Sequence, residues 1–262
     1  MIFGFDRQDV RLAINLFRMN IRDRYLGSTL GSLWAVANPL FMLALYTYVF
    51  GFVFKVRLPG AETTLGYVLW LISGYGPWIA TTEALLAAAG SVVGAAGIVK
   101  NMAFKTELLP LSAVFVGLIN LLVSMTFLLL LLILSGGQVG WTIILLPIVI
   151  AIHFFFLAGV GLWLGAITVF VRDLMQALPN LLTIMLFASP IFYSMESLPA
   201  IVQNISFVNP FFQISDAYRK IILEEQMPAV WGMLYLMLLS LIVFWSGMIS
   251  FRRVKGYFDS AL

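Results

Sequence analysis

Few side chains in this sequence could carry out chemistry, and they do not form a recognisable catalytic arrangement. The 262 residues include one histidine, His153, and no cysteine, which excludes a multi-histidine metal site, a thiolate ligand and a cysteine nucleophile. The sequence contains no G-x-x-x-x-G-K-[ST], H-E-x-x-H or G-x-S-x-G pattern. We therefore predict no catalytic residue, metal site or cofactor in this chain, and we do not expect an enzyme.

Two ionisable side chains lie inside long apolar stretches. Glu83 is the only carboxylate between residues 65 and 99, and a carboxylate within a membrane segment is a candidate functional group. The alternative is that Glu83 pairs with a neighbouring helix or faces a wet cavity. For His153 we expect an interhelical hydrogen bond, with a proton relay as the alternative.

The composition identifies the elements that position these residues. The chain is 62% hydrophobic and 10% charged, with a mean hydropathy of +1.02, whereas soluble domains carry about 25% charged residues. A helix over residues 30–54 would be roughly 37 Å long, which exceeds the ~30 Å hydrocarbon core of a bilayer. We predict an all-α integral membrane protein with six such crossings, over 30–54, 65–99, 111–134, 141–171, 174–193 and 229–251. In the second of these, we expect Gly74, Gly76 and Pro77 to bend the helix or to end a first short piece of it.

Residues 6–24 have a different pattern from the apolar segments. Apolar residues recur at helical spacing, and arginines follow one position later along the same stretch. This segment is too charged to span, so we predict an amphipathic helix in the membrane interface; an ordinary basic flank is the alternative. It also lacks the continuous apolar core and cleavage site of a signal peptide. We treat 1–262 as one domain, with an interfacial helix in 1–28 and a membrane bundle in 29–262.

Residues 194–227 are semi-polar and are divided by prolines into two short pieces. Neither piece can span, so we predict two short re-entrant or surface helices before the last crossing. Most lysines and arginines fall on the side of the termini, near residues 7–24, 100–105, 172 and 252–255. The positive-inside rule therefore places both termini in the cytoplasm and the 194–227 hairpin outside.

Several short motifs occur in a fixed order along the chain. They are RYLGSTLGSLWAVANPLFMLALYTYVF (24–50), SGYGPW (73–78), KNMAFKTELLPL (100–111), VFVRD (169–173), SPIFY (189–193), Leu198-Pro199 and Asn209-Pro210. In this order the chain resembles the permease subunits of ABC-2-type exporters for lipid-linked polysaccharides, which serve O-antigen, teichoic-acid and capsule export. One departure is visible, because the family loop often reads Phe-Pro where this chain has Phe104-Lys105.

The resemblance implies a homodimer in the bacterial inner membrane, paired with two copies of a separate ATPase that binds ATP and magnesium. Its other implied partners are membrane lipids and the glycan substrate, with no nucleic acid. It further implies that residues 100–109, here named the coupling loop, dock on the ATPase through Lys100, Asn101, Phe104, Lys105 and Glu107. A merely solvated basic loop is the alternative. The two short outer helices would form a gate that includes Pro199, Asn209, Pro210, Tyr218 and Arg219.

Aromatic side chains in the first and fifth apolar segments supply a physical reason for sugar transport. Sugar rings present C–H faces that pack on aromatic rings, and such contacts allow a polymer to slide. The predicted channel residues are Phe41, Tyr46, Tyr48, Phe50, Phe187, Phe192 and Tyr193. The alternative is that they are core or interfacial-belt aromatics.

The expected function is that of the membrane channel of an ATP-driven exporter. It would move lipid-linked polysaccharide, O antigen in the first instance, from the cytoplasmic to the outer face of the inner membrane. One alternative is an ABC-2-type exporter of a small lipid or drug, although these often have a large outer insertion that is absent here. An intramembrane transferase is the other alternative, but it would need acidic pairs or metal ligands, and Asp173 alone is a poor candidate.

Overall fold

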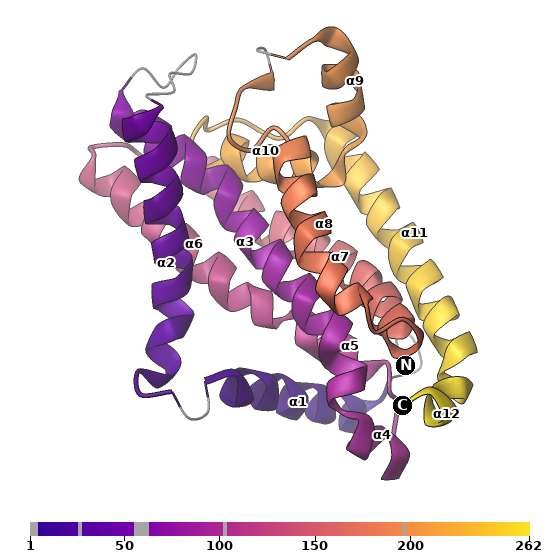
Figure 1. The fold of residues 1–262 in the computed structure, drawn as a ribbon. Helices are drawn as coiled ribbons and strands as arrows, with labels where there is room; N and C mark the ends of the chain where they lie inside the picture. The colour runs from indigo at the N-terminus through magenta and orange to yellow at the C-terminus, as the bar shows by residue number, and fades with distance from the viewer. Residues whose placement is uncertain (1–4, 26–27, 55–62, 102–103, 196–197) are drawn as a thin grey trace.

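A computed structural model describes residues 5–25, 28–54, 63–101, 104–195 and 198–262. Within these ranges the regular elements are helices, and the long ones run side by side as a bundle (Figure 1). The long elements are α2 (Trp34–Tyr46, continued by a π-helical segment Thr47–Val53), α3 (Thr64–Gly94), α5 (Leu108–Val114) with α6 (Val116–Leu134), α7 (Leu146–Phe170), α8 (Leu174–Ala188) and α11 (Val230–Val254).

In the described ranges, four helical segments are long and apolar enough to cross a membrane. They are Trp34–Val53, Leu108–Leu134, Trp141–Phe170 and Val230–Ala261. The other two expected crossings, α3 and α8, are not among them. Helix α8 has 15 residues, a length of roughly 22 Å, and it ends at Ala188 rather than continuing to Tyr193. Ser189 is extended because it precedes Pro190, which disfavours the helical region for the residue before it.

Helix α3 is the central helix of the bundle. It is 31 residues long, and Ser73 to Trp78 are all buried, so much of its surface meets other helices rather than lipid and can be less apolar. We expected Pro77 to bend or end this helix, but the helix is continuous through it. Small residues let its neighbours approach closely: a Cβ on Gly117 of α6 would clash with the Ala80 carbonyl of α3.

Small residues also bring α7 close to its neighbours. A Cβ on Gly159 would lie 2.6 Å from the Phe244 nitrogen of α11, and one on Gly161 would lie 2.8 Å from Val114 of α5. Neither position could carry a side chain without displacing the adjacent helix. Glycine therefore allows α7, α11 and α5 to form one tightly packed layer behind α3.

Helix α1 (Arg7–Tyr25) lies across one end of the bundle (Figure 1). The Asp6 carboxylate caps its start by accepting from the backbone N–H groups of Gln8 and Asp9, at 2.8 and 2.9 Å. Phe5 and Leu262 pack against one apolar cluster with Leu16, so both ends of the described chain lie at the same end of the bundle. The predicted amphipathic helix is thus present, and its placement in a membrane interface stays a prediction.

The remaining short helices lie at the two ends of the bundle. Helix α4 (Ala96–Asn101) lies near α1, with the C-terminal α12 (Phe258–Ala261) at the same end, whereas α9 (Ala200–Val208) and α10 (Pro210–Ile222) lie at the opposite end (Figure 1). The expectation of two short helices in 194–227 is therefore confirmed as secondary structure. Helix α9 is largely exposed, and α10 inserts a buried face between α3, α7 and α11.

Candidate functional site

Aromatic rings from α2, α3 and α8 converge on Phe192, just after α8. Ring centroids lie 4.9 Å from Phe192 for Tyr46, 4.8 Å for Phe50, 5.4 Å for Tyr75 and 5.7 Å for Phe187. We call these five residues the aromatic cluster. The structure thus brings together four of the predicted channel residues from the first and fifth apolar segments, Tyr46, Phe50, Phe187 and Phe192.

The members of the aromatic cluster differ in accessibility. Phe192 has 2% of its surface exposed, so within one protomer its ring is packed among the helices of the bundle. Phe187 is 49% exposed, so part of its ring is accessible to a ligand. Tyr193 is partly buried, and its hydroxyl donates to the Phe187 carbonyl at 2.7 Å, which fixes the turn after α8. Rings on this surface are suited to apolar contact with a flat ligand such as a sugar ring.

Two predicted channel residues, Phe41 and Tyr48, lie apart from this cluster. Both are exposed on α2 and the segment that continues it, and Tyr48 stacks with Phe52 at 6.5 Å. They are seven residues apart, which is two helical turns. They therefore form a second exposed aromatic stripe rather than part of the cluster.

Tyr75 is a member of the aromatic cluster that the sequence reasoning missed. Its ring meets Tyr46 edge-on, with centroids 4.6 Å apart. The available signal was its position inside SGYGPW, which we interpreted as a family motif and as a bend of the helix. Since the helix does not end at that motif, Tyr75 lies on α3 facing Tyr46 of α2.

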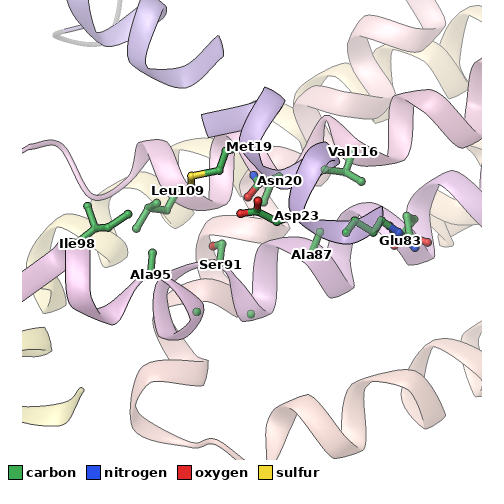
Figure 2. A pocket seen from close by; sticks show the side chains of 14 residues that line it. Met19, Asn20, Asp23, Glu83, Ala87, Ser91, Ala95, Ile98, Leu109 and Val116 are labelled. Atoms are coloured by element: carbon green, nitrogen blue, oxygen red, sulfur yellow. Dashed lines mark hydrogen bonds and ion pairs between the residues drawn. The ribbon is translucent and has the colours of Figure 1, made fainter. Parts of the chain in front are cut away.

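A cavity of about 490 Å³, lined by both polar and apolar residues, lies between α1 and the C-terminal half of α3. Asn20 and Asp23 of α1 and Ser91 of α3 are among its polar lining residues (Figure 2). Glu83 also lines it, and its carboxylate pairs with Arg24 while accepting from the Asn120 amide at 3.4 Å. Glu83 therefore pairs with a residue of a neighbouring helix and also faces a cavity, which is the alternative that the sequence analysis gave for it.

His153 belongs to a buried hydrogen-bonded chain that joins three helices. Its Nε2 lies 2.9 Å from the Thr81 hydroxyl, and its Nδ1 lies 3.3 Å from the Tyr218 hydroxyl. The Thr81 hydroxyl donates to the Pro77 carbonyl, so it accepts from His153 Nε2–H. Nδ1 is then the acceptor for Tyr218. His153 is thus the expected interhelical hydrogen-bond partner, connecting α3 and α7 to α10.

The predicted gate residues divide between surface and interior. Pro199 is exposed and precedes α9, and Pro210 is the first residue of α10. Asn209 caps α10, because its Oδ1 accepts from Phe211 N–H at 3.0 Å while its Nδ2 donates to the Ser189 hydroxyl at 2.8 Å. This pair ties the start of α10 to the end of α8.

The other two gate residues, Tyr218 and Arg219, are buried where α10 meets α3. Arg219 is 4% exposed, and its guanidinium carbon lies 3.6 Å from the centroid of the Trp70 ring. Its Nη2 donates to the Ile191 carbonyl at 3.4 Å. These side chains therefore act by holding α10 in the bundle. The sequence reasoning did not find Trp70, although an indole face is a common partner for arginine.

The coupling loop has an exposed half and an attached half. Lys100 and Asn101 end α4 and are exposed, and Met102 and Ala103 lie outside the described residues. Phe104 is partly buried against the apolar cluster around Leu16. Lys105 pairs with Asp9 of α1, and this hydrogen bond is the main reason that the pKa of the Asp9 carboxyl lies below its usual value.

Glu107 fastens the other end of the coupling loop to α11. It is 1% exposed, and its carboxylate accepts from Arg252 Nε at 2.9 Å and from Lys255 Nζ at 3.3 Å. The sequence predicted Glu107 in the loop but did not predict this partner. The basic residues after the last apolar segment, which we interpreted only as topology signals, were the available clue.

No group of three or more histidine or acidic side chains that could hold a metal occurs in the part of the chain that the structure describes. The arrangement offers an aromatic cluster, a cavity with polar and apolar lining, and a loop tied to two helices.

Comparison with known proteins identifies the class. The model of the ABC-2 type transporter family matches residues 12–223, and the chain belongs to this family. It is a membrane permease, the transport subunit of a system in which separate ATPase subunits use ATP.

Relatives narrow the resemblance further. The chain is 26% identical over 253 residues to the O-antigen export system permease protein RfbA of Myxococcus xanthus, covering 96% of this chain and 95% of that protein. Two proteins of the same name from Klebsiella pneumoniae are 24% and 26% identical over 217 residues, covering 81% of this chain and 80% of theirs.

Proposed function

We propose that this chain forms the membrane channel of an ATP-driven exporter of lipid-linked polysaccharide, with O antigen as the best-supported cargo. The substrate would move from the cytoplasmic to the outer face of the inner membrane. The observation that carries this proposal is similarity over nearly the whole chain to a permease named for O-antigen export.

The proposed assembly is a homodimer with two copies of a separate ATPase. Each protomer would cross the membrane six times. Two of these crossings would be α3, which is largely surrounded by other helices, and α8, which is short. The distribution of lysine and arginine supports cytoplasmic termini. In that orientation α1, α4 and the coupling loop lie on the cytoplasmic side, and α9 and α10 lie on the outer side.

The coupling loop would transmit motion of the ATPase into the bundle. Exposed Lys100 and Asn101 are available to a docking partner. A displacement there passes to α1 through Lys105 and Asp9, and to α11 through Glu107. Because one loop is tied to two helices, both would move together. ATP and magnesium would bind to the ATPase. The conformational change of the ATPase would then move α1 and α11 of this chain.

The aromatic cluster and the exposed stripe on α2 would line the path of the glycan. Ring faces bind sugar rings by apolar contact without fixing one register, which suits a repeating polymer. Movement of α10, held by Arg219 and Tyr218, would open or close the outer mouth. Asn209 supports this role because it links the start of α10 to the end of α8.

Co-purification tests the proposed function. The permease, expressed in its own host and extracted in mild detergent, should carry with it an ATPase and a lipid-linked glycan identified by mass spectrometry. A permease that co-purifies with an ATPase but retains a small lipid or drug-like molecule instead would overturn the polysaccharide assignment.

A further inference from the structure

An apolar groove of about 710 Å³ is lined by α1 and by helices α5, α6, α7 and α11. Two aromatic pairs form part of its inner wall, Phe115 with Phe154 at 5.9 Å and Phe155 with Phe244 at 4.4 Å between centroids. The outer wall is the apolar stripe of α1, formed by Val10, Ile14 and Phe17. The groove therefore presents carbon surface on both sides.

The two walls indicate what kind of molecule fills the groove. The inner wall belongs to segments that are long and apolar enough to cross a membrane, so it faces hydrocarbon. On the outer wall, Val10 is 55% and Ile14 45% exposed. Apolar surface of this kind is unfavourable in water. A flexible hydrocarbon chain fits a long groove of this lining.

Positive charge lies directly beside the groove. Arg7, Arg11, Arg18 and Arg22 recur at spacings of four, seven and four residues, so they form one face of α1, here named the arginine row. At 100° per residue this row lies next to the stripe of Val10, Ile14 and Phe17. All four arginines are exposed, and none has an ion pair with another residue of the described ranges.

We propose that this groove binds one anionic phospholipid, with an acyl chain between α1 and α7 and the headgroup phosphate on the arginine row. A basic amphipathic helix beside hydrocarbon is complementary to an anionic lipid in both charge and polarity. This is a defined site in each protomer, distinct from general contact between α1 and the membrane surface.

The site adjoins the coupling loop. Asp9 lines the groove and pairs with Lys105 of the loop. Leu108 at the end of the loop and Leu111 just after it line the same groove. A bound lipid would therefore hold α1 and the start of α5 together. The lipid would act as a structural cofactor of the loop, whatever cargo the transporter moves.

Native mass spectrometry tests the site directly. The full-length permease would be released from nanodiscs that contain equal amounts of phosphatidylglycerol and phosphatidylcholine. We expect retained lipid that is predominantly phosphatidylglycerol. The double variant Arg7→Gln/Arg11→Gln should lower the ratio of retained phosphatidylglycerol to retained phosphatidylcholine about tenfold. The reason is that each basic residue near an anionic lipid surface strengthens binding. Arg253→Gln, an exposed arginine of α11, is the matched control.

A second pair of variants tests the acyl chain. Ala151→Phe should fill the groove and abolish retention of both lipids, whereas Ala44→Phe, at an exposed alanine of α2, should not. Val10→Trp fills the groove from the α1 side and serves if Ala151→Phe fails to fold. Undiminished lipid in a folded groove-filling variant would overturn the proposal. So would retention of an isoprenoid phosphate in preference to phosphatidylglycerol, or an intermolecular cross-link from Val10→Cys showing that a second copy fills the groove.

Discussion

The guanidinium of Arg219 lies over the indole of Trp70, with its central carbon 3.6 Å from the ring centroid. This contact joins α10 to α3 inside the bundle. Glycine at residue 74 leaves room for the guanidinium, since a Cβ there would meet Nη2 of Arg219 and displace it. The guanidinium also donates from Nη2 to the Ile191 carbonyl at 3.4 Å.

Weakening this contact should loosen α10. Gly74→Ala displaces the guanidinium, and Arg219→Lys removes the planar group that stacks on Trp70. We expect the free energy of unfolding of each variant to fall by about 2 kcal/mol, the size of a desolvated cation–π contact. Thermal unfolding in detergent measures this loss. Arg253→Lys, at an exposed site, should unfold like the wild type, and an unchanged midpoint for Gly74→Ala would contradict the packing argument.

Glu107 should be more important for coupling than Asp173, an exposed acidic residue outside the coupling loop. Glu107→Gln leaves Arg252 and Lys255 without their shared carboxylate. Because both cations are partly exposed, we expect the free energy of unfolding to fall by only about 1–2 kcal/mol. Breaking a fully buried ion pair would cost more. ATPase stimulation by the permease should fall more than in Asp173→Asn. Equal stimulation in the two variants would show that the link to α11 does not transmit motion.

The contact between Asp9 and Lys105 predicts a specific pH dependence. Lys105 holds the pKa of Asp9 below its usual value in the folded protein. The stabilisation is therefore complete above the unfolded-state pKa of about 4 and is lost as the pH falls through the lower folded-state pKa. The stability difference between wild type and Asp9→Asn should be constant from pH 5 to 7 and shrink below pH 4. A stability difference that grows on acidification would show that folding does not lower the pKa of Asp9.

The absence of cysteine allows a clean topology test. A cysteine at Gln138, exposed between α6 and α7, should react with a membrane-impermeant thiol reagent added outside intact cells. A cysteine at Asn101, exposed at the end of α4, should react only after the membrane is opened. The opposite pattern would overturn cytoplasmic termini.

The sequence predicted the helices well, because apolar length and proline position determine them directly. It placed the end of α8 five residues too late, since Pro190 acts through the backbone of Ser189. It also expected Gly74, Gly76 and Pro77 to bend or end this part of α3, but the helix does not end there, and the residues around Pro77 are buried against neighbouring helices.

Pairings between distant residues were harder to predict than the helices themselves. Glu83 was recognised as unusual, but Arg24 as its partner depends on how α1 crosses α3. Likewise Tyr75 joins the aromatic cluster only because α2 and α8 flank the same face of α3. Sequence periodicity identifies the face of one helix but not its neighbour, so these contacts required the structure.

Transport by reconstituted permease and ATPase tests the central claim most directly. In proteoliposomes that contain lipid-linked glycan, we expect ATP-dependent movement of the glycan across the bilayer. Tyr46→Ala/Phe187→Ala should slow this movement while complex formation and basal ATP hydrolysis persist, and Leu130→Ala, at an exposed site of α6, should move glycan at the wild-type rate. No glycan movement by the intact complex, or full-rate movement by the aromatic double variant, would contradict the account.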